Sequence, residues 1–187
     1  MKRIFLILTA LCIFAGASLK AQTIDYYTGK AEIKGSNYVY KVSEKPGYKC
    51  TIISLKNINN TKIGIRQYWP DGQSVFPSEL TGRVRFLDKN QVSVYREVFN
   101  AQEIAAFKSV DDFVLGIIYV VDANGNVLEV EFYFRNFPMF LAINPDKLYL
   151  LEQKLIERVK FSVDPLAKLL EYTTVSFSGT EIKPNDL

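Results

Sequence analysis

Two glutamates, Glu129 and Glu131, have the spacing that acid–base chemistry could use. Residues two apart on a β-strand project from the same face, and two carboxylates held close together raise the pKa of one of them. A glycosidase places two carboxylates on either side of a cleft, so a hydrolase acting on envelope polymers is one interpretation. Acidic residues on a strand more often form the solvated face of a sheet. We therefore favour a binding surface that includes Glu129, Glu131 and Tyr133, with no catalytic residue assigned.

The stretch Asp122-Ala-Asn-Gly-Asn126 has oxygen-bearing side chains at the first, third and fifth positions of a calcium-binding loop. That loop also needs a glycine at its sixth position and a glutamate at its twelfth. Val127 and Tyr133 stand there instead, so the sequence predicts no metal site. Asn124-Gly125 is typical of a two-residue type I′ turn, which favours a β-hairpin here.

The dipeptide Tyr68-Trp69 could bind a ligand through its aromatic rings. Aromatic rings stack on the apolar faces of sugars, so a glycan is one candidate ligand. Aromatic residues in a β-rich protein also pack into its core, and the sequence leaves both interpretations open. Tyr68 and Trp69 are therefore candidate ligand-binding residues.

The chain has no histidine and two cysteines. The lack of histidine excludes Ser–His and Cys–His catalysis and histidine-ligated zinc. Cys12 belongs to the predicted signal peptide, so Cys50 remains alone and cannot form an internal disulfide. We expect Cys50 to be buried in a strand, and we expect no cofactor.

The N-terminus has the layout of a cleaved secretory signal. Lys2 and Arg3 precede the apolar run 4–17, which is short for a membrane span, and small residues follow. We predict a signal peptide over 1–21 with cleavage after Ala21, or else after Ala17. Without 1–21 the chain has 20 basic and 20 acidic residues. The sequence therefore predicts no nucleic-acid partner, because binding nucleic acid needs a basic face. No later segment predicts a transmembrane helix, and we expect the protein in the periplasm or at the cell surface of a Gram-negative bacterium.

The remaining elements follow from hydrophobic periodicity and from turn and cap residues. Extended patterns predict strands at 38–42, 50–56, 63–69, 83–87, 92–99, 113–121, 161–163 and 172–177. The strands 83–87 and 92–99 would form a hairpin across residues 88–91. Helices are predicted at 101–108, which begins with a capping box, at 145–159, and at 165–170. These elements form an α+β fold in which a mainly antiparallel sheet carries one principal helix, 145–159, on one face.

A type I′ turn at Asn124-Gly125 would also fix the register of the hairpin around it. One face would be apolar and covered by the 145–159 helix. Its pairs would be Val121 with Leu128, Tyr119 with Val130, Ile117 with Phe132, and Leu115 with Phe134. The other face would pair Val120 with Glu129, Ile118 with Glu131, and Gly116 with Tyr133. Two unpaired carboxylates are costly to bury, so we expect this second face to meet solvent.

The hairpin sequence VVDANGNVLEVEF, the helix 146–158 and the following VKFSV resemble small proteins exported by Bacteroides-type bacteria, in families classed as domains of unknown function. The hairpin–helix–strand part also resembles the C-terminal domain of TonB. The length of 22–187 suits one α+β domain. Two hairpin–helix subdomains, near 38–110 and 111–178, are the alternative, because each hairpin has an Asp-x-Asn turn and an Asn-capped helix follows it. We interpret the protein as an exported, non-enzymatic binding module of the cell envelope whose partner is a protein or a glycan.

Overall fold

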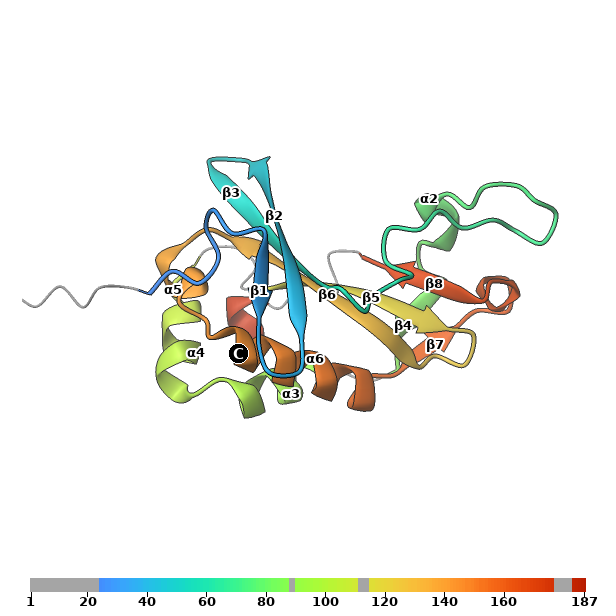
Figure 1. Ribbon diagram of the computed structural model, residues 1–187. Coiled ribbons are helices and arrows are strands. Elements are labelled where there is room, and N and C mark those ends of the chain that lie inside the picture. Colours follow the sequence, from blue (N-terminus) through green and yellow to red (C-terminus); the bar gives the residue numbers. More distant parts are fainter. Residues whose placement is uncertain (1–23, 88–89, 111–114, 177–182) are drawn as a thin grey trace, which may run out of the picture.

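The computed structural model describes residues 24–87, 90–110, 115–176 and 183–187 (Figure 1). The predicted signal peptide, the turn residues 88–89, the strand residues 113–114 and Phe177 lie outside these ranges. The chain forms a six-stranded antiparallel sheet in the order β1-β2-β3-β6-β5-β8. Its strands are β1 (Glu32–Lys34), β2 (Val39–Gly47), β3 (Cys50–Asn57), β6 (Val127–Arg135), β5 (Gly116–Asp122) and β8 (Tyr172–Val175). The predicted antiparallel α+β architecture is confirmed.

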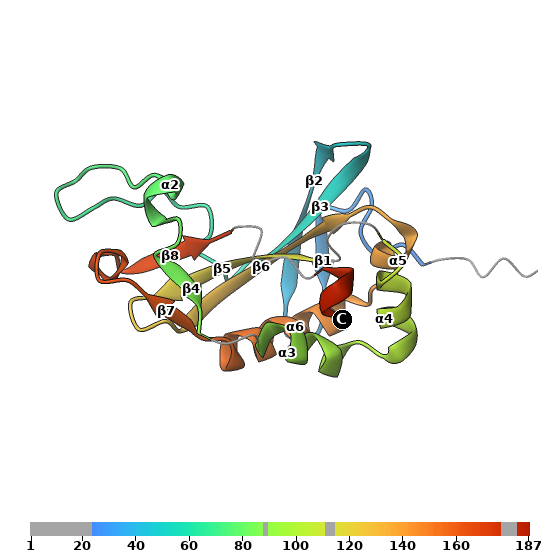
Figure 2. The same ribbon diagram turned by 180° about the vertical axis from the view of Figure 1, so that it is seen from behind.

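Most of the helices gather on one face of the sheet, as Figures 1 and 2 show from opposite sides. They are α3 (Asn90–Val98), α4 (Ala101–Phe107), α5 (Pro138–Leu141) and the longest helix, α6 (Pro145–Arg158). Between them and the sheet lies the core, whose fully buried side chains include Tyr40, Leu55, Tyr119, Phe132, Leu148, Leu151 and Leu155. The predicted principal helix and its place on the sheet are confirmed.

Helix α6 begins where the sequence predicts. The Asn144 side chain accepts a hydrogen bond from the N–H of Asp146, and Pro145 occupies the first turn, where its missing N–H costs nothing. Helix α4 likewise begins with the predicted capping box between Asn100 and Glu103. The capping residues therefore determine where helices α4 and α6 begin.

The β5–β6 hairpin has the predicted register through Val120, with Ile117 opposite Phe132 and Tyr119 opposite Val130. Closer to the turn the prediction is wrong. Val121 pairs with Val127, and Leu128 is a bulged residue that is 38% exposed. Gly125, at φ 85°, donates to the Asp122 carbonyl and ends a three-residue loop, so the turn is not type I′.

The Asp122 carboxylate explains this turn. Its Oδ1 accepts hydrogen bonds from the N–H groups of Asn124 and Asn126, and its Oδ2 accepts one from the Asn126 side chain. Burial would raise the pKa of Asp122, but these hydrogen bonds together hold it below its usual value. Asp122 and Asn126 thus build a hairpin tip rather than a calcium loop.

Two predicted strands are wrong. Residues 92–99 belong mostly to helix α3, whose buried face recurs at helical spacing through Gln91, Val94, Tyr95, Val98 and Phe99. Residues 63–69 form irregular chain, because Gly64 takes a φ of 83° that interrupts an extended strand. The predicted helix 165–170 is a short 3₁₀ turn, η1 (Ala167–Leu169). Cys50 is only half-buried.

A second, two-stranded sheet joins β4 (Val84–Phe86) to β7 (Phe161–Val163). This small sheet also contacts the tip of the β5–β6 hairpin, because the N–H of Phe161 donates to the Gly125 carbonyl at 2.9 Å. A side chain at position 125 would overlap the Phe161 carbonyl. Glycine at 125 is therefore required both by its positive φ and by this close approach.

Candidate functional site

Glu129 is an anchor for a loop and not an exposed acid. Its carboxylate accepts hydrogen bonds of 2.8–3.0 Å from the N–H groups of Thr61, Lys62 and Ile63, and its side chain is 7% exposed. Asn60 adds a 2.7 Å bond from its side-chain amide to the Val130 carbonyl. The expectation that the whole face meets solvent is wrong at Glu129, because loop 57–63 folds over it.

Glu131 and Tyr133 remain half-buried on the outer face of β6. Burial raises the pKa of Glu131, and the ammonium groups of Lys56 and Lys45 only partly offset this effect. The Tyr133 ring covers Gly116, where a methyl group would overlap it. Glu129 and Glu131 do not flank a cleft, because one carboxylate is held by backbone amides and the other lies beside lysines.

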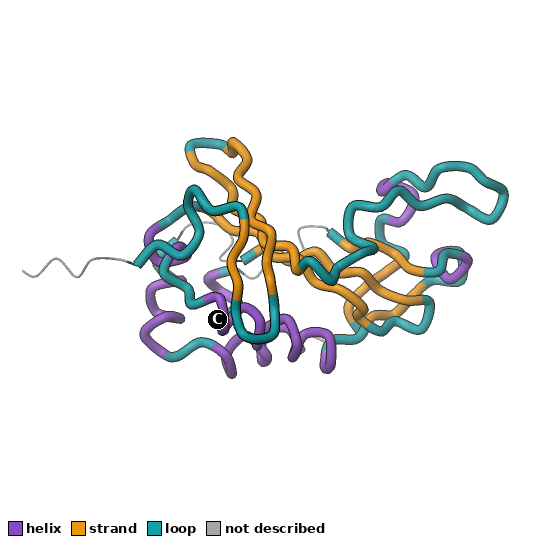
Figure 3. Tube along the Cα trace, in the orientation of Figure 1, coloured by secondary structure: helices purple, strands orange, loops and turns teal. Residues whose placement is uncertain are grey.

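After loop 57–63 the chain forms a long arm, residues 64–82, which carries Tyr68 and Trp69. The arm crosses β8, runs out to a tip and returns through α2 (Pro77–Leu80) to β4 (Figures 1 and 2). Figure 3 shows that most of it is loop. At the tip, the N–H of Trp69 donates to the Gln73 carbonyl, and the N–H of Gly72 donates to the Trp69 carbonyl.

Glu79 of α2 closes the arm on itself. Its carboxylate accepts a 2.7 Å bond from the N–H of Phe76 and a 3.4 Å bond from the Trp69 indole. Tyr68, by contrast, is 55% exposed and pairs only through an isolated bridge to Ser74. Trp69 therefore helps to shape the arm, whereas the Tyr68 ring is accessible.

A groove of about 820 Å³ lies between the arm, the start of β4 and strand β8. Its lining is mostly apolar and includes Ile65, Val75, Phe76, Leu80, Val84 and Val175. Ile65 and Phe76 are 57% and 58% exposed, which is unusual for side chains that could have packed inward. Two exposed arginines, Arg66 and Arg85, also line the groove, and its lining contains no Asp or Glu. We call this cavity the arm groove.

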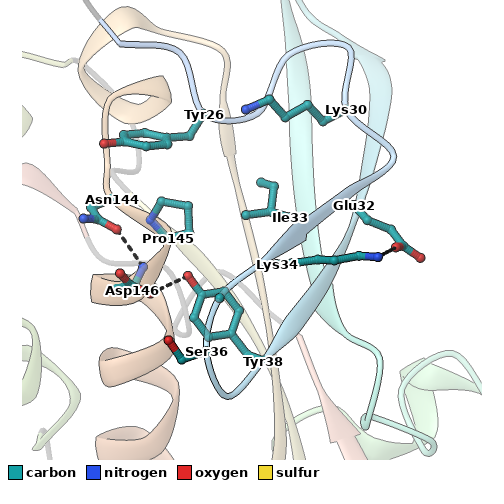
Figure 4. A pocket seen from close by; sticks show the side chains of 11 residues that line it. Tyr26, Lys30, Glu32, Ile33, Lys34, Ser36, Tyr38, Asn144, Pro145 and Asp146 are labelled. Carbon is teal, nitrogen blue, oxygen red and sulfur yellow. Dashed lines mark hydrogen bonds and ion pairs between the residues drawn. The ribbon is translucent and has the colours of Figure 1, made fainter.

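A second cavity, of about 700 Å³, lies between the N-terminal segment, β1 and the start of α6 (Figure 4). Its polar groups are largely paired with one another. Tyr38 donates a 2.7 Å hydrogen bond to Asp146, and Lys34 forms an ion pair with Glu32 at 3.5 Å. Figure 4 shows Glu32 directed away from Asp146, so these two carboxylates do not face a common point.

One buried carboxylate, Glu152 of α6, lies in the core. It is 2% exposed and accepts a 2.5 Å hydrogen bond from the Tyr40 hydroxyl and weaker ones from the Asn57 side chain. Burial raises its pKa, although the hydrogen bonds from Tyr40 and Asn57 act in the opposite direction. Glu152 reaches neither cavity, so we assign it to the packing of α6 on β2 and β3.

The structure does not bring the five predicted site residues together. Glu129, Glu131 and Tyr133 share one strand face, Tyr68 and Trp69 lie on the arm, and none of them lines the arm groove or the second cavity. Sequence reasoning missed Ile65 and Phe76 as site residues, because Ile65 lies in a segment predicted as a strand and Phe76 has no periodic pattern around it. Their one signal is the run of proline, glycine and polar residues from 70 to 82, which is typical of a long surface loop.

No helix within the described ranges has the length and apolar character needed to cross a membrane. Within the same ranges, histidine, cysteine and acidic side chains do not gather in threes at a point where a metal ion could bind.

The fold of the chain is similar to that of a solved protein structure. No protein-family model matches the chain, and no curated protein matches it. Among solved structures, it is similar to the crystal structure of a DUF5043 family protein from Bacteroides uniformis. The two share 20% sequence identity with a TM-score of 0.68, over 82% of this chain and 86% of that one. The similarity to TonB stays a prediction. The chain therefore has the fold of an uncharacterised family of Bacteroides-type bacteria, as its hairpin–helix–strand sequence predicted.

Proposed function

We propose that this protein is an exported, non-enzymatic binding module of the cell envelope, and that its ligand binds in the arm groove. The main observation behind this proposal is that Ile65 and Phe76 are exposed within a concave, mostly apolar surface. Ligand sites are typically clefts of 300–1,000 Å³ with apolar walls and a few polar groups, and the arm groove has this size and lining.

The distribution of carboxylates supports binding over hydrolysis. A carboxylate-dependent hydrolase needs two acids that flank its substrate. The lining of the arm groove contains no acid, and Glu129 is occupied by three backbone N–H groups. Binding therefore accounts better than catalysis for the exposed apolar side chains.

Site-specific photocrosslinking tests this function. A photoreactive phenylalanine analogue replaces Phe76 in the groove or, as the control, Tyr48, which is 81% exposed at the far end of the β2–β3 hairpin. Irradiation of cell envelopes should give a defined crosslinked product from position 76 and none from position 48. Equal labelling at both positions, or none at position 76, would contradict a ligand site in the groove.

A further inference from the structure

The open edge of β8 forms one side of the arm groove. β8 is the last strand of the six-stranded sheet, and Thr173, Thr174, Val175 and Ser176 all line the groove. The outgoing part of the arm passes on one side of this strand, and the returning part, with α2, leads to β4 on the other side (Figures 1 and 2). An unpaired strand edge presents main-chain N–H and C=O groups to whatever lies beside it.

The hydrogen bonds of β5 determine which groups of β8 point into the groove. The N–H of Asp122 donates to the Asn126 carbonyl, so the main-chain groups of Asp122 face β6. Main-chain groups alternate in direction along a strand, so those of Val120 also face β6. Thr174 lies opposite Val120. Because the main-chain groups of Val120 face β6, these two residues form a non-hydrogen-bonded pair. The N–H and C=O of Thr174 therefore point away from β5, into the groove.

The side chain of Gln67 supports this geometry independently. Its amide Nε2 donates to the Tyr172 carbonyl from the arm side. Tyr172 is two residues before Thr174, so its main-chain groups point the same way. A side-chain amide thus already occupies the place where a neighbouring strand would donate its first hydrogen bond. Within the described residues, no equivalent partner reaches the main chain of Thr174.

From this edge we infer that the arm groove binds an extended, acidic peptide segment, which adds to the sheet as a strand beside β8. The inference rests on the proposed function and names its ligand class. The main chain of an extended peptide supplies a C=O that can accept from the Thr174 N–H and an N–H that can donate to the Thr174 C=O. Alternate side chains of the peptide would lie against Ile65 and Phe76 on the groove wall.

Charge specifies the peptide further. Arg66 and Arg85 are exposed in the lining, and the Arg85 Nε donates to the Gly82 carbonyl, which holds that side chain beside the groove. Arginine binds carboxylates through paired N–H groups. An acidic side chain or a terminal carboxylate of the peptide complements these two arginines, since the groove lining carries no competing acid.

The test uses the purified full chain and a random heptapeptide display library. Enriched peptides are synthesised with a fluorophore, and their affinity is measured by fluorescence anisotropy. We expect acidic sequences with alternating apolar residues. Thr174→Pro removes the outward N–H and should weaken binding by about tenfold or more. Thr174→Ala keeps that N–H and is the matched reference, so the loss of affinity from Thr174→Ala to Thr174→Pro measures the main-chain hydrogen bond.

Backbone methylation of the peptide tests the same hydrogen bonds without changing the protein. N-methylation of alternate residues should abolish binding at the positions facing β8 and leave it unchanged at the others. This series decides the question even if Thr174→Pro fails to fold. Peptides that respond to Phe76→Ala but to neither Thr174→Pro nor methylation would overturn strand addition and leave the groove as a binding site.

Three other outcomes would overturn the inference that the arm groove binds a peptide. These are failure to enrich any sequence, enrichment of sequences that do not respond to Phe76→Ala, and a dimer of the chain that Thr174→Pro dissociates. The last would make a second copy the occupant. The crosslinking at position 76 then decides separately whether the groove binds another class of ligand, such as a glycan.

Discussion

The substitution Glu129→Ala tests whether one buried carboxylate fixes the base of the arm. The change removes the acceptor of three backbone N–H groups, those of Thr61, Lys62 and Ile63, which lie within 3.0 Å of its oxygens. Because the arm begins directly after these residues, we expect loss of stability together with loss of order at 61–63.

The expected cost follows from the burial of the three donors. The N–H of Ile63 lies in a buried residue and would lose its partner, at about 1–3 kcal/mol. Thr61 is exposed and Lys62 half-buried, so their N–H groups can turn to water and each lose only about 0.5 kcal/mol. The free energy of unfolding should therefore fall by about 2–4 kcal/mol, which lowers Tm by about 4–16 °C in a protein of this size.

Urea unfolding followed by circular dichroism measures the change in stability, and hydrogen exchange measures protection of the 61–63 amides. Glu131→Ala is the matched control, because Glu131 lies two residues away on the same strand and accepts no backbone hydrogen bond from the loop. It should cost less than about 1 kcal/mol. The role of Glu129 as an anchor of the loop is refuted if Glu129→Ala lowers the free energy of unfolding no more than Glu131→Ala does. It is also refuted if the 61–63 amides stay protected in Glu129→Ala.

Three further predictions concern the core and the N-terminus. The raised pKa of Glu152 means that the folded protein holds this proton more tightly than the unfolded chain. Its stabilising contribution is present below the ordinary value of 4.5 and is lost as pH rises through the raised value. Relative to the wild type, Glu152→Gln should thus gain stability between about pH 4 and pH 8 in urea titrations; an equal difference at both pH values would contradict this. Leu151→Ala, at a fully buried position, should cost about 2–5 kcal/mol in the same assay, and a cost under about 0.5 kcal/mol would mean an exposed face. Mass spectrometry of the protein from a Gram-negative host should find Gln22 or Ser18 at the N-terminus, whereas intact Met1 in the cytoplasm would contradict export.

The sequence predicts elements well where local chemistry and hydrophobic periodicity agree. Asn144-Pro145 specifies the start of α6, and the alternation of apolar residues specifies the register of β5 with β6. The error in 92–99 arose where β-branched residues favour a strand although the apolar spacing favours a helix. The helical spacing buries Val94, Tyr95 and Val98 in the core, which favours the helix. On the opposite side of α3, Glu97 pairs with Lys154 and Arg158 of α6.

The arm groove could not be predicted in the same way. It joins the arm to β8, which lie about 100 residues apart in the sequence, and β8 is an edge strand only because of the strand order. Glu129 illustrates the same limit. The alternation of apolar and polar residues along β6 correctly predicts that Glu129 lies on the outer face. Nothing in the sequence near Glu129 shows that residues 61–63 will cover that face.

The strand order also has a consequence for the speed of folding. The hairpins β2–β3 and β5–β6 each pair neighbouring segments, but β3 must join β6, and its partners Leu55 and Phe132 lie nearly 80 positions apart. Hairpins form within about 1–10 µs, whereas distant pairings delay folding into the range of about milliseconds to seconds. We therefore expect docking of the two hairpins to limit the refolding rate. Stopped-flow refolding should be slowed more by Leu55→Ala, at the seam, than by an equally destabilising change within α6.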